Sequence, residues 1–388
     1  MNISVFNGAG QVDYMYGLVS GLAHNETDKI DVLDVDLTSD LFQPFRNVDY
    51  YPVFRVLPRS SPLYSKAANT LRFYFLQIWF LISKKRRVVH FQWLDRFIYI
   101  DRIILPLVAR LSGHRVVLTV HNINAGKRDN RDSFGNRISL KILYRLANRL
   151  IVHTAKSKEE LMAEFPVKES KIAVIKHGMN NRVTISGLDT REARKRLQIG
   201  EDEKVVLFFG NIDYYKGLDI LLDSFSELPD GFLSETRLLI AGNSKSPEYS
   251  SIIGDKINAQ RIKDRVTASF GYIRDEDVEI YFMAADCIVL PYRNIYQSGV
   301  VFMAYTFGLP LIVADIGNFR NDIVEGKTGY LINMEEPGQV SKTLMKYFES
   351  EMYRNLPETR EDIKKWAWQN YSWDAIGAET RKVYESIG

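Results

Sequence analysis

A glycine-bearing loop near the amino terminus could bring the backbone close to a phosphate group. The segment NGAGQVD (7–13) stands between an apolar run and a helical pattern. Gly8 and Gly10 would allow close approach of a ligand beside a helix amino end. The loop does not complete a G-x-G-x-x-G fingerprint, because Asp13 occupies the last glycine position. A plain tight turn explains the loop equally well.

Two loops in the second half of the chain have the same character. GNIDYYKG (210–217) places Lys216 immediately before an amphipathic helical pattern. A cation at a helix amino end is unfavourable unless an anion lies between them, although an ordinary solvated lysine remains an alternative. In the other loop, Ser298, Gly299 and Val300 offer backbone N–H groups and a hydroxyl at a predicted helix start. Two phosphate-suited turns indicate a nucleotide diphosphate.

Histidines are the remaining candidates for proton chemistry. His121 ends an apolar strand pattern and is followed by Asn122, so it could reach a ligand at the carboxyl edge of a sheet. His153 and His177 also close strands, where a structural role bonded to backbone is the commoner outcome. The histidines form no i, i+4 pair, and Cys287 is the single cysteine, so we expect no metal site. Walker and G-x-S-x-G motifs are absent from the sequence.

The elements that must position these loops form two series of strands alternating with helices. Apolar runs separated by helix-length segments indicate parallel sheets covered on both faces. A polar stretch, 180–204, separates the two series, which predicts two α/β domains. The predicted strands are 3–6, 29–36, 87–92, 115–121, 149–154 and 171–178 in the first series, and 204–210, 237–242, 265–271, 287–292, 310–317 and 329–332 in the second.

The net charge of +3 over 388 residues hides a strong polarity. Residues 55–149 hold 19 Lys/Arg and four Asp, hence 19 − 4 = +15, and the remainder holds 32 basic and 44 acidic residues, or −12. No secretory signal is visible at the amino terminus, and the longest strongly apolar run, FYFLQIWFLI (73–82), is far shorter than the roughly 20 residues that span a bilayer. We therefore expect a cytoplasmic protein that does not cross a membrane.

Several strings, in order, resemble the retaining glycosyltransferases of family 4. They are LTVHN, RLANRLIVHTAKSKEEL and KIAVIKHG in the first half, then FFGNIDYYKGLDILLDSF, LLIAG, FGYIRDEDVEIYFMAADCIVLPY and FGLPLIVADIGNFRNDIVEGKTGYLI. The ending YSWDAIGAETRKVYESI resembles the family's last helix, which crosses back onto the first domain. The resemblance implies a GT-B fold, two Rossmann-like domains with parallel sheets facing a central cleft: an acceptor-side domain, 1–182 joined by helix 373–388, and a donor-binding domain, 183–372.

The resemblance also implies roles for individual residues. His121 would bond a hydroxyl of the transferred sugar, Lys216 would pair with the diphosphate, and Gln297 would reach the sugar; these are the expected catalytic residues. No metal and no cofactor are expected, the nucleotide-sugar being a substrate. The implied donor-binding set is Gly8, Gly10, Asn211, Lys216, Tyr272, Ile273, Gln297, Ser298, Gly299 and Val300.

This sequence departs from the family pattern at three places. The two glutamates of the usual E-x7-E element fall on Ile295 and Met303, and the arginine that usually helps bind the diphosphate falls on Asn211 or Asp213. The string around Gln297 is similar to that of a subgroup that makes these contacts differently. A catalytically silent nucleotide-sugar-binding relative or scaffold is therefore kept as an alternative. A sugar-nucleotide 2-epimerase would need acid/base carboxylates for which the sequence offers no place.

The basic segment favours a membrane-bound acceptor. Aromatic and basic residues together suit an anionic membrane surface, and no nucleic-acid-binding module is recognisable. For 73–82 alone, a helix packed in the core explains the pattern equally well. We expect docking on the inner membrane face and a polyprenyl-diphosphate-linked glycan acceptor, as in bacterial polysaccharide assembly. The residues of the expected patch are Arg72, Lys84, Lys85, Arg86 and Arg87.

Overall fold

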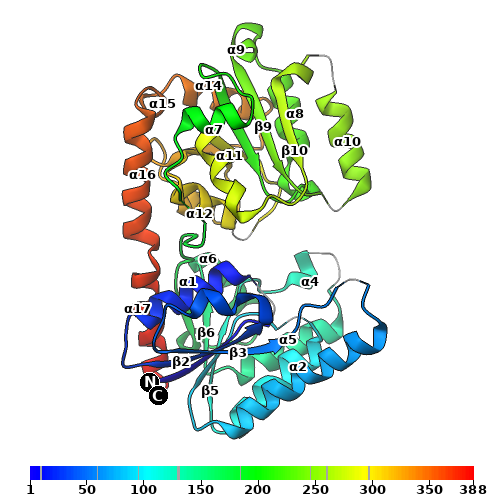
Figure 1. Ribbon diagram of the computed structural model, residues 1–388, viewed down its shortest axis with the longest axis vertical. Helices are drawn as coiled ribbons and strands as arrows, with labels where there is room; N and C mark the ends of the chain where they lie inside the picture. Colours follow the sequence, from blue (N-terminus) through cyan, green and yellow to red (C-terminus); the bar gives the residue numbers. More distant parts are fainter. Residues whose placement is uncertain are drawn as a thin grey trace. The chain divides into compact units, whose positions relative to one another are not determined.

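The chain folds into two compact units, Met1–Gly178 with Tyr371–Gly388, and Met179–Asn370 (Figure 1). The computed structural model describes all residues except 9–10, 59, 95, 129–131, 184, 245, 259–260 and 296–297. Each unit is built on one parallel sheet with helices on both faces, as the alternating pattern predicts, and this is the Rossmann-like architecture that the family resemblance implies.

The first unit holds a seven-stranded parallel sheet in the order β3-β2-β1-β4-β5-β6-β7. Its strands are β1 (Asn2–Phe6), β2 (Lys29–Val35), β3 (Val48–Phe54), β4 (Val88–Phe91), β5 (Arg115–Thr119), β6 (Arg149–Val152) and β7 (Ile172–Val174). Its helices are α1 (Val12–Ala23), α2 (Leu63–Ser83), α3 (Leu105–Leu111), α4 (Ala125–Arg128), α5 (Phe134–Leu146), α6 (Ala155–Glu164) and α17 (Trp373–Glu385), with short turns η1 (Asp36–Phe42), η2 (Ile100–Ile104) and η3 (Glu169–Lys171).

Alternate residues of these strands feed two separate apolar cores. On β5, Val116 and Leu118 pack with helices α2, α3, α5 and α6, whereas Val117 packs with α1 and α17. This period of two is what a strand buried on both faces requires. α17, from the end of the chain, lies against α1 and so forms part of the first unit (Figure 1).

The edge strand β3 was not predicted. Its sequence VDYYPVF contains Pro52, and a register shift in β2 at Asp34 and Val35 lies beside it. Proline lacks the N–H that a central strand needs, which lowers the strand signal, but an edge strand bonds through one side only. β3 therefore pairs with β2 although its sequence pattern does not predict a strand.

The second unit holds a six-stranded parallel sheet in the order β10-β9-β8-β11-β12-β13. Its strands are β8 (Lys204–Phe209), β9 (Thr236–Gly242), β10 (Val266–Phe270), β11 (Cys287–Leu290), β12 (Leu311–Ala314) and β13 (Gly329–Ile332). Its helices and turns are α7 (Thr190–Arg196), η4 (Tyr214–Lys216), α8 (Leu218–Ser226), α9 (Asp230–Ser234), α10 (Pro247–Ile257), η5 (Lys263–Arg265), η6 (Asp275–Asp277), α11 (Val278–Ala284), α12 (Gly299–Thr306), α13 (Phe319–Asp322), α14 (Gln339–Phe348), α15 (Glu351–Arg354) and α16 (Leu356–Tyr371), whose last residue belongs to the first unit.

Helix α8 shows how the sequence pattern becomes a core. Leu218, Leu221, Leu222 and Phe225 are all buried, as their i, i+3, i+4, i+7 spacing predicts. They hold the start of α8 against the sheet, directly after the loop that carries Lys216. Cys287 is fully buried in β11, and burial raises the pKa of its thiol, as expected of an unreactive structural cysteine.

Candidate functional site

Lys216 is a buried cation at the carboxyl end of β8. Its side chain is only 7% exposed. The Nζ atom donates to the Tyr292 hydroxyl at 2.9 Å and lies 4.6 Å from the centre of the Tyr292 ring. Burial opposes the charge, but Tyr292, Tyr215 and Asp213 favour it and leave the pKa of Lys216 raised. In the described part of the chain no carboxylate forms an ion pair with this ammonium, so an anionic ligand would complete it.

Gly217 makes the turn that points Lys216 inward. Its φ is +69°, a left-handed conformation, and an added Cβ would stand 2.1 Å from the Pro291 carbonyl oxygen. Only glycine meets both conditions without distortion. The loop and the segment after β11 are therefore packed backbone against backbone.

The amino end of α12 lies beside the same ammonium. Ser298 is the residue before the helix, is buried, and has its hydroxyl 3.4 Å from that of Tyr292. A Cβ on Gly210 would lie 3.5 Å from Val300 Cγ2 and 4.0 Å from Lys216 Nζ, so the two loops meet. The first amides of a helix have no carbonyl within it to bond, which suits them to an anion. The structure thus brings the turn that begins at Ser298 together with Lys216.

Gln297, the expected sugar contact, lies outside the described residues. Its neighbour Ser298 is described, so the segment that carries Gln297 leads directly into the turn before α12. Its role stays a prediction.

Arg293 contacts the Lys216 loop, and the sequence analysis did not single it out. Its guanidinium bonds both oxygens of Asp219, at 2.8 and 2.6 Å, and the Tyr214 carbonyl at 2.7 Å. Its backbone N–H donates to the Tyr215 carbonyl at 2.7 Å. Asp219 pairs with the guanidinium, and through these contacts Arg293 joins the Lys216 loop to the segment after β11.

A cavity of about 330 Å³ opens at the carboxyl ends of β8, β9 and β10. It is lined by apolar and small polar side chains, among them Ile212, Asn243 and Phe270. A flat base fits such a lining better than a phosphate does. Of the expected donor-binding residues, Tyr272 is 77% exposed just beyond β10 and Ile273 follows it, but neither lines this cavity. The residues that line this cavity end or follow three different strands, so they are far apart in sequence and form no motif.

Asn211 follows β8 closely and is exposed. It stands on the short segment between Gly210 and the loop turn at η4, so its side chain is available to a ligand at this sheet edge. The Asn211 side chain is neutral, whereas the family pattern has an arginine at this position or at that of Asp213.

In the first unit, Gly8 and His121 are linked through Trp93. Gly8 has φ +63°, and a Cβ there would stand 2.1 Å from the Trp93 carbonyl oxygen. The Trp93 ring stacks on the His121 imidazole, with centroids 3.7 Å apart and planes 14° apart. Gly8, at the end of β1, and His121, after β5, therefore lie at the same carboxyl edge. Gly10 lies outside the described residues.

His121 belongs to a cluster of neutral histidines. His153 Nε2 lies 3.3 Å from His121 Nδ1, and the His177 ring centroid lies 5.4 Å from that of His153. His90 bonds the hydroxyls of Tyr384 at 2.6 Å and Thr119 at 2.8 Å. Burial lowers the pKa of His90 to about 3, of His153 to about 4 and of His177 to about 3, and lowers that of His121 as well. At neutral pH the cluster is uncharged.

Two polar atoms in this region have no hydrogen-bond partner among the described residues. They are His121 Nε2 and Gln92 Oε1, both buried. Both residues line a cavity of about 40 Å³. An unpaired buried polar atom costs roughly 1–3 kcal/mol, so a ligand hydroxyl that bonded either atom would be favoured.

The expected cationic patch is corrected by the structure at one position. The Arg87 side chain is 9% exposed and ion-paired with Asp31, so it does not belong to an exposed patch. Lys85 and Arg86 are exposed, Lys84 donates to the Tyr51 hydroxyl at 2.8 Å, and Arg72 is half-buried. The sequence does not distinguish Arg87 from the basic residues before it. In the structure Arg87 directly precedes β4, and its side chain pairs with Asp31 of β2.

Within the described residues, no cluster of three metal-ligating side chains occurs, and none of the helices there has the length and apolarity of a bilayer span. The run 73–82 is instead divided between two environments on α2. Phe73, Tyr74, Gln77, Phe80 and Leu81 are buried, whereas Phe75, Trp79 and Ile82 are exposed. The expected helix packed in the core is therefore correct for only one part of this run.

Two family models together match most of the chain. Residues 9–182 match the model described as glycosyltransferase family 4, and residues 189–369 match glycosyl transferases group 1. The chain belongs to the GT-B glycosyltransferases. It is also similar over 95% of its length, at 24% identity, to an uncharacterized glycosyltransferase of Methanocaldococcus jannaschii, of which 92% is covered.

Other relatives match in part. A D-inositol 3-phosphate glycosyltransferase of Corynebacterium aurimucosum is 24% identical over 72% of this chain and 66% of its own length. One from a Mycobacterium species is 30% identical over 51% of this chain and 44% of its own length. The chain thus spans two thirds or less of these relatives.

Solved structures confirm the fold of this glycosyltransferase. HepE from Anabaena, in complex with UDP, matches with a TM-score of 0.73 at 15% identity, covering 100% of both chains. Sucrose-phosphate synthase from Thermosynechococcus elongatus matches with a TM-score of 0.73 at 17% identity, covering 100% of this chain and 99% of its own.

Proposed function

We propose that this glycosyltransferase moves a sugar from a nucleotide-sugar to a glycan acceptor with retention of configuration. The observation that carries the donor assignment is Lys216, a buried ammonium with a neutral hydroxyl for a partner, beside the amino end of α12. A diphosphate supplies the negative charge that both features lack. UDP in the related HepE structure supports a uridine nucleotide as the first probe.

The reaction asks for stabilisation of the leaving diphosphate rather than for a carboxylate pair. As the bond between the sugar's anomeric carbon and the phosphate oxygen breaks, Lys216 and the amides after Ser298 stabilise the developing charge. The acceptor hydroxyl attacks from the same face, forms the new bond to the anomeric carbon, and passes its proton to the phosphate. Because the ammonium and the helix end supply positive charge, the proposed reaction requires no metal.

Two side chains are assigned to the sugar in this proposal. His121 is neutral and has an unpaired Nε2 atom among the described residues, so it can bond a sugar hydroxyl. Gln297, which precedes the turn at Ser298, reaches the sugar in place of the glutamate that this sequence lacks at Ile295.

We also propose that the acceptor is lipid-linked, in cell-surface polysaccharide synthesis, and that the first unit docks on an anionic membrane surface. Leu71, Phe75, Trp79 and Ile82 recur at helical spacing along the outer face of α2. Phe75 is 64% exposed and Trp79 61% exposed, which is too much apolar surface for a solvated helix.

A neighbouring helix extends this apolar surface. α3 packs beside α2 in the same core and exposes Leu107 and Leu111, the latter by 79%. Lys85 and Arg86 follow the end of α2 and are exposed. Apolar side chains bordered by cations are the pattern of a protein that lies on an anionic bilayer.

A donor panel tests the proposed reaction. Uridine, adenosine and guanosine diphosphate-sugars are titrated into the protein, and release of nucleoside diphosphate is followed with and without a polyprenyl-diphosphate-linked glycan. We expect one nucleotide class to bind and acceptor-dependent release to follow. Binding without release would favour the catalytically silent relative, and binding of none would overturn the donor assignment.

Vesicle flotation tests the membrane proposal. The protein should float with vesicles that contain phosphatidylglycerol and not with pure phosphatidylcholine. Replacing Phe75 and Trp79 with serine should weaken flotation at least fivefold, whereas the same change at the exposed Ile252 of α10 in the second unit should not. Equal binding to neutral and anionic vesicles would contradict the proposal.

A further inference from the structure

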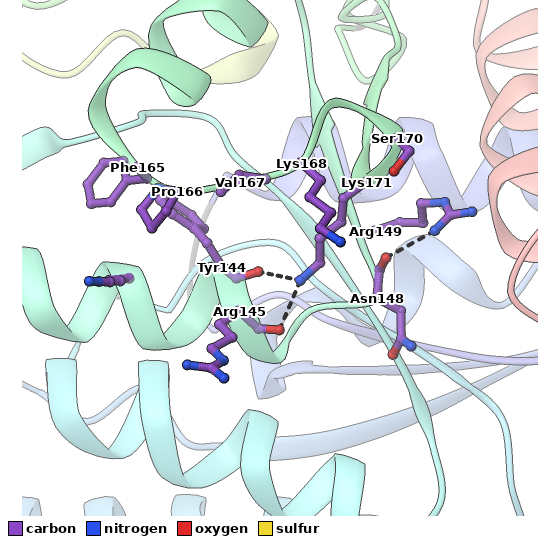
Figure 2. Close-up of a pocket in the computed structure, with 11 residues that line it drawn as sticks. Tyr144, Arg145, Asn148, Arg149, Phe165, Pro166, Val167, Lys168, Ser170 and Lys171 are labelled. Carbon is purple, nitrogen blue, oxygen red and sulfur yellow. Dashed lines mark hydrogen bonds between the residues drawn. The ribbon is translucent and has the colours of Figure 1, made fainter.

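A second cavity of the first unit, about 490 Å³ in volume, is lined by a concentration of cations (Figure 2). It lies between the end of α5 and the segment that joins α6 to β7. Its basic side chains are Lys141, Arg145, Arg149, Lys168 and Lys171. Among the described residues that line it, none is acidic.

This cavity is separate from the candidate donor and sugar contacts. Arg149 begins β6 and Lys171 immediately precedes β7, so both stand at the amino edge of the sheet. Gly8 and His121 follow β1 and β5 and stand at the carboxyl edge. In a parallel sheet these edges are opposite, so the cations here cannot contact a ligand held at His121.

The one acid within the segment that joins α6 to β7 is already engaged elsewhere. Glu169 lies in the same segment, but its carboxylate accepts from Lys158 at 2.7 Å. Lys171 is held instead by the carbonyl oxygens of Tyr144 and Arg145, at 2.7 and 2.9 Å, near the end of α5 (Figure 2). The ammonium is thus fixed at the cavity wall by neutral groups.

The positive charges that line the cavity repel one another. Burial, and then the charges of Arg110, Arg145 and Arg149, lower the pKa of Lys171 to about 8. Like charges gathered without a counter-charge repel one another and raise the free energy of the unliganded site. In the described part of the chain, Lys141, Arg145, Arg149 and Lys168 form no ion pair that would relieve this.

We propose that the cavity is a binding site for a phosphate group. Guanidinium and ammonium groups, with the Ser170 hydroxyl on the same wall, match phosphate oxygens in charge and hydrogen bonding. A dianion offsets more of the repulsion than a single carboxylate does. The phosphate comes either from a small soluble phosphate compound or from a lipid headgroup.

Calorimetry of inorganic phosphate and pyrophosphate tests the soluble source. The titrations use a Lys216→Met background, so that the loop before α8 does not contribute. The double variant Arg145→Gln/Lys168→Gln changes two exposed side chains and should weaken binding at least tenfold. The matched control Lys29→Gln/Arg46→Gln removes the same charge from exposed positions of the same unit and should change it less than twofold.

Flotation with phosphatidic acid vesicles, compared with phosphatidylserine vesicles of equal charge, tests the lipid source. A selective preference for phosphatidic acid that the double variant loses and the control keeps supports a headgroup site, even where free phosphate does not bind. Equal behaviour of the double variant and the control in both assays overturns the proposal. Nucleotide binding by the double variant should be unchanged, so this outcome is separate from that of the proposed function.

Discussion

The carboxyl edges of the two sheets present opposite chemistry. In the second unit a buried cation, Lys216, stands beside a helix amino end, whereas in the first unit the histidines around His121 are neutral. One edge is suited to charge and the other to hydrogen bonds with hydroxyl groups. Within the second unit, the cation beside the helix end supports the proposed diphosphate ligand.

The largest expected effect of this difference appears on acidification. His90 and His153 have lowered pKa values in the folded protein, about 3 and about 4. The unfolded chain has an ordinary histidine pKa near 6.5, so below that pH both residues take up protons when the protein unfolds. Stability is therefore full above that pH and falls as pH drops. Each histidine should account for a loss of about 2 kcal/mol between pH 6.5 and 4.5. Burial raises the pKa of Asp34 to about 6, which acts in the opposite direction and offsets part of the loss.

Hydrogen exchange resolved by peptide, at pH 6.5 and 4.5, measures the loss of stability in each unit separately. The first unit should lose protection first. Carboxylates such as Asp219 and Glu279 in the second unit have lowered pKa values and lose their stabilising effect only below about pH 4. Equal loss in the two units, or earlier loss in the second, would contradict the comparison.

A smaller effect is expected at the two glycines that shape these edges. Alanine at Gly8 or at Gly217 meets the same obstacle, a left-handed φ and a carbonyl oxygen 2.1 Å from the new Cβ. Each change should cost about 2 kcal/mol or more of unfolding free energy, measured by urea denaturation. Gly217→Ala should also weaken nucleotide binding because it displaces the Lys216 loop, whereas Gly8→Ala should disturb the Trp93 stack on His121.

Gly254 gives the control and the smallest change. It lies inside α10, and a Cβ there would meet no atom within 4 Å. Gly254→Ala should stabilise the protein by about 0.5–1 kcal/mol, since alanine favours a helix interior. If all three glycine variants lost stability alike, strain at Gly8 and Gly217 would not be the cause.

Much of the fold and part of the candidate site could be predicted from the sequence. The features that could not be predicted have physical reasons. The sequence predicts that Lys216 and Ser298 stand just before helices, because loop and helix signals are local, and the structure confirms these positions. Their part in binding stays a prediction. The edge strand β3 was missed because Pro52 weakens its pattern. The cavity near Phe270 and the pairing of Arg293 with Asp219 join segments far apart in sequence, which no local pattern reports.

Calorimetric titration of UDP, or of the nucleotide class that the panel selects, into the Lys216→Met variant tests the central claim most directly. Losing a charge-assisted contact should weaken binding by about 2 kcal/mol, roughly 30-fold. Lys216 Nζ also donates to the Tyr292 hydroxyl, so urea denaturation of the unliganded variant is measured alongside to show that it is folded. Lys342→Met, at an exposed position of α14, should bind normally. Unchanged affinity in Lys216→Met would contradict the account.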